Sequence, residues 1–209
     1  MQGENYFETA GRSSVSGDRT KLYQAEFQRV KLQASYRSVD EYLESLEMVG
    51  TARPFEPAKF SRIAELSMRS NQFNLRTVRY TQADIRQIRE NPGCLTLQLE
   101  LRDRFGDHGL VGVVVGRETG PGELFVESWF MSCRVLKRGM EEFTVNKLME
   151  AARGRGFKRV VGEYIPTPKN AMVRDIYKSM GFSPIGENRY AMEVNRYLEK
   201  KTFIKECAE

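Results

Sequence analysis

The sequence has one histidine and three cysteines among its 209 residues, and these shortages exclude several kinds of site. A serine–histidine–aspartate triad or a histidine-rich metal site would have to be built around His108 alone, so we expect neither. Cys94, Cys133 and Cys207 lie far apart in the sequence, are odd in number and form no CxxC pair. The sequence therefore predicts no disulfide framework, no zinc site and no other metal.

Long apolar runs are also missing. No apolar stretch approaches the roughly 18 residues that a membrane-spanning helix needs, and residues 1–5 do not open a signal peptide. We therefore expect a cytoplasmic protein that does not use a membrane as partner. The excess of 33 Lys and Arg over 28 Asp and Glu gives a net charge of +5, which favours a polyanionic ligand or an acidic protein partner. Because no RNA-binding aromatic signature or arginine-rich tract accompanies this charge, nucleic acid is not expected as a partner.

Residues 1–46 show helical patterns without any strand pattern. Asp18 is placed to cap a helix over residues 22–36, where apolar side chains recur at mostly helical spacing. A second, short helix is predicted from Ser38, which forms a capping-box pattern with Glu41. Because two helices with no sheet of their own bury little apolar surface, we expect this segment to be a helical linker or appendage.

Residues 47–196 alternate between strand and helix patterns and predict one α/β (α+β) domain, a mixed central sheet flanked by helices. Residues 197–209 form a charged tail. Leucines at every second position of residues 94–102 predict a half-buried strand, and the continuous apolar run over residues 110–115 predicts a strand buried on both faces. We expect strands at 48–55, 94–102, 110–117, 124–132, 160–165 and 190–194, and helices from Pro57, at 81–89, at 138–153 and at 170–180.

The segment that joins the strand ending near Ser132 to the helix after it is the first candidate site. A helix N-terminus offers free backbone N–H groups to an anion. Cations at this end oppose the helix dipole, so the basic side chains here are unfavourable unless an anion binds. The alternative is a solvated basic turn. The residues predicted to bind the anionic group are Ser132, Arg134, Val135, Leu136, Lys137, Arg138, Gly139 and Met140.

Four further positions have both a functional and a purely structural interpretation. Tyr177, on the helix that Asn170 is expected to cap, is either a general acid for a departing thiolate or a packed ring. Cys133 is either an acyl-accepting nucleophile beside a positive helix terminus or a small buried filler. His108 is either a catalytic residue or a surface residue of a hairpin turn, and we expect the surface position. The amide-rich run with Asn71, Gln72 and Asn74 is either a substrate-facing loop or a helix stop.

Together with the element order, two motifs resemble the acyl-CoA N-acyltransferase (GNAT) fold, whose phosphate loop reads Arg/Gln-x-x-Gly-x-Gly/Ala and whose later helix ends in Tyr…Gly-Phe. The matching residues are Arg134, Lys137 and Gly139 in the loop, and Asn170, Tyr177, Gly181 and Phe182 in the helix. Within that fold, the chain is similar to the C-terminal domain of FkbH-like proteins of the haloacid-dehalogenase (HAD) superfamily. The segments that carry this likeness are 51–55, 70–75, 79–81, 103–107, 132–136 and 164–170.

The resemblance implies a role in loading a glyceryl group onto an acyl carrier protein, next to a HAD-like phosphatase domain or subunit. It implies that the loop from Arg134 to Met140, with Asn170, holds coenzyme A or an acyl-phosphopantetheine arm, and that Tyr177 is the acid. Lys137 stands where the loop pattern has glycine, which favours a single carrier phosphate over free coenzyme A. Two alternatives remain: a non-catalytic module that docks a carrier protein, and an amine acetyltransferase that uses acetyl-CoA.

Overall fold

Eight strands hydrogen-bond side by side in the order β6-β7-β5-β4-β3-β2-β1-β8 in the computed structural model, which describes residues 24–207. The strands are β1 (Val49–Arg53), β2 (Cys94–Asp103), β3 (Gly106–Gly120), β4 (Glu123–Met131), β5 (Arg159–Glu163), β6 (Ser183–Gly186), β7 (Arg189–Glu193) and β8 (Lys205–Glu206). The helices are the N-terminal helix, described over residues 24–33, then α2 (Val39–Ser45), α3 (Phe60–Arg69), α4 (Gln82–Glu90), α5 (Met140–Gly154) and α6 (Ile176–Ser179). The expected mixed α/β architecture is confirmed.

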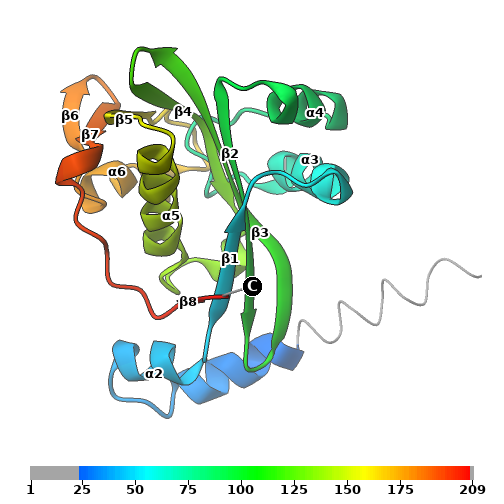
Figure 1. Cartoon of the computed structure of the whole chain (residues 1–209). Coiled ribbons are helices and arrows are strands. Elements are labelled where there is room, and N and C mark those ends of the chain that lie inside the picture. Colours follow the sequence, from blue (N-terminus) through cyan, green and yellow to red (C-terminus); the bar gives the residue numbers. More distant parts are fainter. Residues whose placement is uncertain (1–23, 208–209) are drawn as a thin grey trace, which may run out of the picture.

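The sheet has helices on both faces, with α3 and α4 on one and α5 and α6 on the other (Figure 1). Strands β1 to β4 form an antiparallel meander, whereas β5 pairs with β4 in parallel after the crossover through α5. The central strand β3 is buried on both faces, as expected. Val111 and Val114 pack in the core under α5, and Val113 and Val115 pack under α3 and α4.

Strands β4 and β5 are paired only between Glu123 and Val126 on the β4 side. Beyond that point residues 73–75 lie between the two strands. The Leu75 amide donates to the Trp129 carbonyl at 3.2 Å, and the Leu75 carbonyl accepts from the Ile165 amide at 2.8 Å. These residues therefore act as a short extra strand that fills the gap between β4 and the continuation of β5.

The expectation that β2 is buried on one face only was wrong. Thr96 and Gln98, on the polar side of the pattern, are 8% and 2% exposed. Thr96 Oγ1 accepts from the Phe55 amide at 3.2 Å, and Gln98 Oε1 accepts from the Glu56 amide at 2.9 Å. The polar side chains are buried because the chain entering α3 crosses them and uses them as hydrogen-bond partners.

Helix boundaries follow the capping chemistry. Thr81 and Asp84 form the predicted capping box at the start of α4. The helix expected over residues 170–180 is instead a 3₁₀ turn (Ala171–Val173) followed by the short α6, and the Asn170 side chain makes no capping bond. The predicted element was wrong because the Asn170 amide is used elsewhere, as described below.

The two terminal segments pack against the same sheet. Tyr42 and Leu46 belong to the core under α5, as do Tyr197 and Ile204 near the other end of the chain. Strand β8, which the sequence patterns did not predict, pairs in parallel with β1. The expected helix cap Asp18 lies outside the described residues. No helix in the described part of the chain is long and apolar enough to cross a membrane.

Candidate functional site

Two residues in the segment between β4 and α5 have the left-handed backbone conformation. Lys137 has φ of 62° and Gly139 has φ of 81°. A side chain at position 139 would place its Cβ 2.9 Å from Thr202 Oγ1, so only glycine fits there. Lys137 adopts the same region with a side chain, at a cost of about 1 kcal/mol. Helix α5 therefore begins at Met140, two residues later than predicted.

A carboxylate of the chain already lies at the first amides of α5. Glu141 Oε1 accepts a hydrogen bond from the Lys137 amide at 3.1 Å. Burial raises the pKa of Glu141, although hydrogen bonds from its own amide and from that of Lys137 lower it in part. The C-terminal segment covers the same turn, because Thr202 Oγ1 donates to the Gly139 carbonyl at 3.0 Å. On the side that faces α6, the structure thus places Glu141 where the sequence analysis expected a phosphate.

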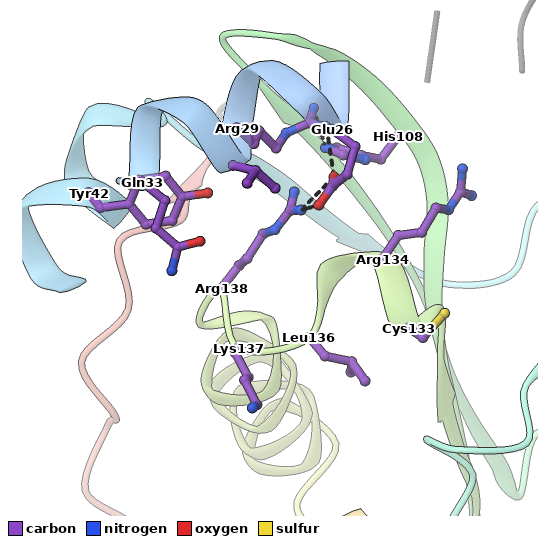
Figure 2. A pocket seen from close by; sticks show the side chains of 11 residues that line it. Glu26, Arg29, Gln33, Tyr42, His108, Cys133, Arg134, Leu136, Lys137 and Arg138 are labelled. Carbon is purple, nitrogen blue, oxygen red and sulfur yellow. Dashed lines mark hydrogen bonds and ion pairs between the residues drawn. The ribbon is translucent and has the colours of Figure 1, made fainter. Parts of the chain in front are cut away.

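On the opposite side, the same turn forms one wall of a cavity of about 690 Å³, which we call the corner cavity (Figure 2). Its other wall is the N-terminal helix together with α2. A volume of this size is typical of pockets for small molecules and cofactors. The residues that line the corner cavity are Glu26, Arg29, Val30, Gln33, Tyr42, His108, Cys133, Arg134, Leu136, Lys137 and Arg138.

A buried ionic network attaches the N-terminal helix to the hairpin between β2 and β3. Arg29 donates to both carboxylate oxygens of Asp103, at 2.7 and 2.9 Å, and His108 Nε2 lies 3.0 Å from Asp103 Oδ2. Burial by itself would raise the pKa of Asp103, but hydrogen bonds from His108 and Arg29 outweigh it and hold that pKa well below its usual range. His108 is 8% exposed, so its expected surface position was wrong.

Arg138 extends this network across the cavity. Its Nη2 donates to Glu26 Oε2 at 3.0 Å, and Figure 2 shows the side chain reaching from the turn toward the N-terminal helix. Nη1 of Arg138 is buried and has no hydrogen-bond partner among the described residues; Asp103 Oδ2 lies 3.7 Å away. Arg138 therefore joins the two walls of the corner cavity by a charged contact.

Cys133 and Arg134 are exposed, and both line the corner cavity. The interpretation of Cys133 as a buried filler was therefore wrong. Among the residues predicted to bind the anion, Arg134, Leu136, Lys137 and Arg138 line this cavity. Ser132 accepts a hydrogen bond from Arg134 Nε at 3.3 Å, whereas Val135 and Met140 are fully buried in the core.

Tyr177 lies away from the corner cavity, inside the core. Its ring stacks on Tyr190, with centroids 5.6 Å apart, and packs edge-on to Trp129 at 6.1 Å. The ring also covers Gly162, where any side chain would collide with it. Burial raises the pKa of Tyr177, and its hydroxyl makes no regular hydrogen bond to the described residues. In this conformation no substrate reaches the phenol, so the geometry matches the packing alternative.

The predicted asparagine contacts hold the chain's own backbone. Asn170 Nδ2 donates to the Asn74 carbonyl at 2.9 Å and to the Ile165 carbonyl at 3.0 Å, while Asn170 Oδ1 accepts from the Thr167 amide at 2.7 Å. Asn74 Oδ1 accepts from the Thr77 amide at 2.8 Å. Both asparagines are completely buried. They therefore clamp residues 73–75 in the gap beside β4.

The other two residues of the predicted substrate loop contribute little to a cavity. Asn71 Oδ1 accepts from Arg79 Nη2 at 2.5 Å, and Gln72 is exposed. Gln33 and Tyr42 also line the corner cavity, although no motif in the sequence identifies them. The only available signal was the helical spacing of residues 26, 29, 30 and 33, which places them on one face of a helix.

No protein-family model matches the chain, and neither does any curated protein sequence. Solved structures do match it. Spermidine N-acetyltransferase from Vibrio cholerae, in complex with CoA and spermine, has a TM-score of 0.56 at 13% identity over 71% of this chain and 97% of that one. The ribosomal-protein-S18-alanine N-acetyltransferase from Escherichia coli has a TM-score of 0.52 at 13% identity, over 70% of this chain and 94% of that one. Ard1 from Thermoplasma volcanium has a TM-score of 0.51 at 22% identity, over 69% of this chain and 95% of that one. These similarities show that the chain has the fold of the N-acetyltransferases.

Proposed function

We propose that this chain is an acyltransferase-type domain that handles an acyl group held as a thioester on the phosphopantetheine arm of an acyl carrier protein. The observation that carries the proposal is the exposed thiol of Cys133 in the wall of the corner cavity, next to Arg134 and near Lys137 and Arg138. Cations at such a site make charge-assisted hydrogen bonds to a phosphate. The resemblance to FkbH-like proteins supports a glyceryl group as cargo and a HAD-like phosphatase as partner.

The chemistry that fits these residues is thiol–thioester exchange. The Cys133 thiolate attacks the carbonyl carbon of the carrier thioester, and the tetrahedral intermediate collapses with cleavage of the bond to the pantetheine sulfur. The departing pantetheine thiolate takes up the proton that Cys133 released, and the acyl group remains on Cys133. No oxidant, reductant or metal takes part in this step.

A carrier arm fits this chain better than free coenzyme A, because the side of the turn that faces α6 is acidic. A second hollow on that side is lined by three carboxylates, Asp40, Glu141 and Glu142, against the ammonium groups of Lys137 and Lys201. Coenzyme A carries further phosphates, which these carboxylates would repel. A phosphopantetheine arm brings one phosphate, which the corner cavity can accept.

The test is an intact-mass measurement after incubation with an acyl-loaded carrier protein. We expect a mass increase equal to the acyl group, located on Cys133, and its loss in Cys133→Ser. Cys207→Ser is the matched control. This variant should still be acylated on Cys133, because Cys207 follows β8 at the edge of the sheet, away from the corner cavity. Absence of the adduct in the unaltered protein, with transfer undiminished in Cys133→Ser, would overturn the proposal.

One observation favours a second function, that of a non-catalytic module that docks the carrier for a partner enzyme. The Tyr177 hydroxyl is sealed in the core, so the acid expected from the fold's motif is not available in this conformation. A docking module predicts that the loaded carrier binds and leaves with its acyl group intact. The acetyl-CoA alternative is tested by calorimetric titration, in which micromolar binding of acetyl-CoA would support it.

A further inference from the structure

We propose that the phosphopantetheine arm lies in the corner cavity against the N-terminal helix and α2, where Gln33 and Tyr42 recognise its amide groups. This inference rests on the proposed function and extends it, because it assigns part of the binding site to residues outside the acyltransferase-like domain. It also places the arm on the side of the turn that faces away from α6.

The first support is the state of Tyr42. This residue is 6% exposed, and its hydroxyl enters the corner cavity without a hydrogen bond to any described residue (Figure 2). The hydroxyl is open to the cavity, so a ligand there can reach it. Burial raises the pKa of Tyr42, so the hydroxyl keeps its proton and can donate it in a hydrogen bond. Tyr42 therefore offers a donor that only water or a ligand in the cavity can satisfy.

The second support is the face that the N-terminal helix turns toward the cavity. Glu26, Arg29, Val30 and Gln33 all line it, and their spacing of three and four residues places them on one face of the helix. Arg29 and Glu26 are occupied by the ionic network, with Asp103 and Arg138 as partners. The carboxamide of Gln33, which can both donate and accept, is exposed and makes no hydrogen bond within the described chain, so a ligand in the cavity can reach it.

The third support is the match between this wall and the chemistry of the arm. A phosphopantetheine arm carries two amides, a branched apolar group and one phosphate. Gln33 and Tyr42 suit the amides, Val30 and Leu136 offer apolar contact, and Lys137 is an exposed cation for the phosphate. In Figure 2 Cys133 lies at one end of the cavity, and Gln33 and Tyr42 lie toward the other. An arm that spans the cavity can therefore bring its thioester to Cys133.

The experiment compares binding of the acyl-loaded carrier by the whole chain and by two variants, Tyr42→Phe and Gln33→Ala. Loss of one hydrogen bond is expected to raise the apparent KM for the loaded carrier about fivefold in each variant. The maximal rate of Cys133 acylation should stay unchanged, since neither residue reaches the thioester. Tyr42→Phe keeps the ring that packs in the core, so the fold is retained. Ser179→Ala and Lys201→Ala, on the side that faces α6, are the controls and should not change KM.

The possible outcomes separate this inference from the proposed function. The first outcome assumes that acyl transfer to Cys133 occurs. If Tyr42→Phe and Gln33→Ala then leave KM unchanged while Lys201→Ala raises it, the arm lies on the side of the turn that faces α6, and the inference is wrong. If no acyl group reaches Cys133 but calorimetry shows that free phosphopantetheine binds and that Tyr42→Phe weakens it, the site stands and the transfer proposal fails. A carrier that lacks the arm should bind less tightly than the loaded one, and equal binding would count against the inference.

Discussion

The amide of Leu75 donates a hydrogen bond to the carbonyl of Trp129, and this contact places residues 73–75 in the gap where β4 and β5 separate. Arg76 completes the closure, because its guanidinium pairs with Glu163 on β5 at 2.7 Å and donates to the Glu127 carbonyl on β4 at 3.0 Å. The chain thus supplies its own third strand between two strands of the sheet. An approach to Tyr177 from that gap requires these contacts to break.

Asn170→Ala should destabilise the fold rather than remove a ligand contact. The substitution deletes hydrogen bonds to the carbonyls of Asn74 and Ile165 and leaves buried backbone groups without partners. We expect a loss of about 2–3 kcal/mol in the free energy of unfolding, measured by urea denaturation. The exposed Gln72→Ala is the control and should be neutral. An unchanged stability with weakened carrier binding would instead make Asn170 a ligand contact.

Tyr177→Phe tests whether the gap opens during catalysis. Because the hydroxyl is enclosed by the core and by residues 73–76, we expect the rate of acyl transfer to stay within about twofold of that of the unaltered protein. A group that donates a proton in the transition state would be worth at least about a hundredfold. A rate loss of that size in single-turnover kinetics would show that residues 73–76 move aside and that the phenol acts as the acid.

The stability of the chain should depend on pH through Asp103. Because its pKa is lowered in the folded state, ionised Asp103 stabilises the fold above its ordinary unfolded pKa of about 4. That contribution is lost as the pH falls below about 4, toward the folded-state pKa. Asp103→Asn should cost about 3 kcal/mol at neutral pH, because it removes the buried carboxylate charge to which Arg29 donates two hydrogen bonds.

The measurement for Asp103 is the free energy of unfolding as a function of pH. The variant should show a flatter acid limb than the unaltered protein, and hydrogen exchange of the N-terminal helix should be faster in it. Asp175→Asn, at an exposed site, serves as the control and should leave the curve unchanged. If Asp103→Asn and the control gave the same acid limb, the ionic network would not attach the N-terminal helix as described.

The sequence by itself determined the fold class and most of the elements. The continuous apolar run that forms β3 identified its burial on both faces, because a residue pattern reports directly which faces of a strand are covered. The Thr81–Asp84 box fixed the start of α4 for a similar reason, since capping is a contact between residues three apart. The resemblance to the GNAT fold, which rested on the turn before α5 and on the Tyr177 motif, agreed with the solved structures.

Only the tertiary structure decided which side of that turn is open and which of the other predicted site residues are enclosed by the chain itself. The amide-rich run around Asn74 has the same composition whether it binds a ligand or the chain's own backbone, so its role depends on Asn170, 96 residues away. The burial of His108 likewise depends on Arg29 from a helix far along the chain. Residue patterns describe neighbours in sequence. Contacts between distant segments arise from packing, and they leave Cys133 and Tyr42 facing one cavity while Tyr177 is enclosed in the core.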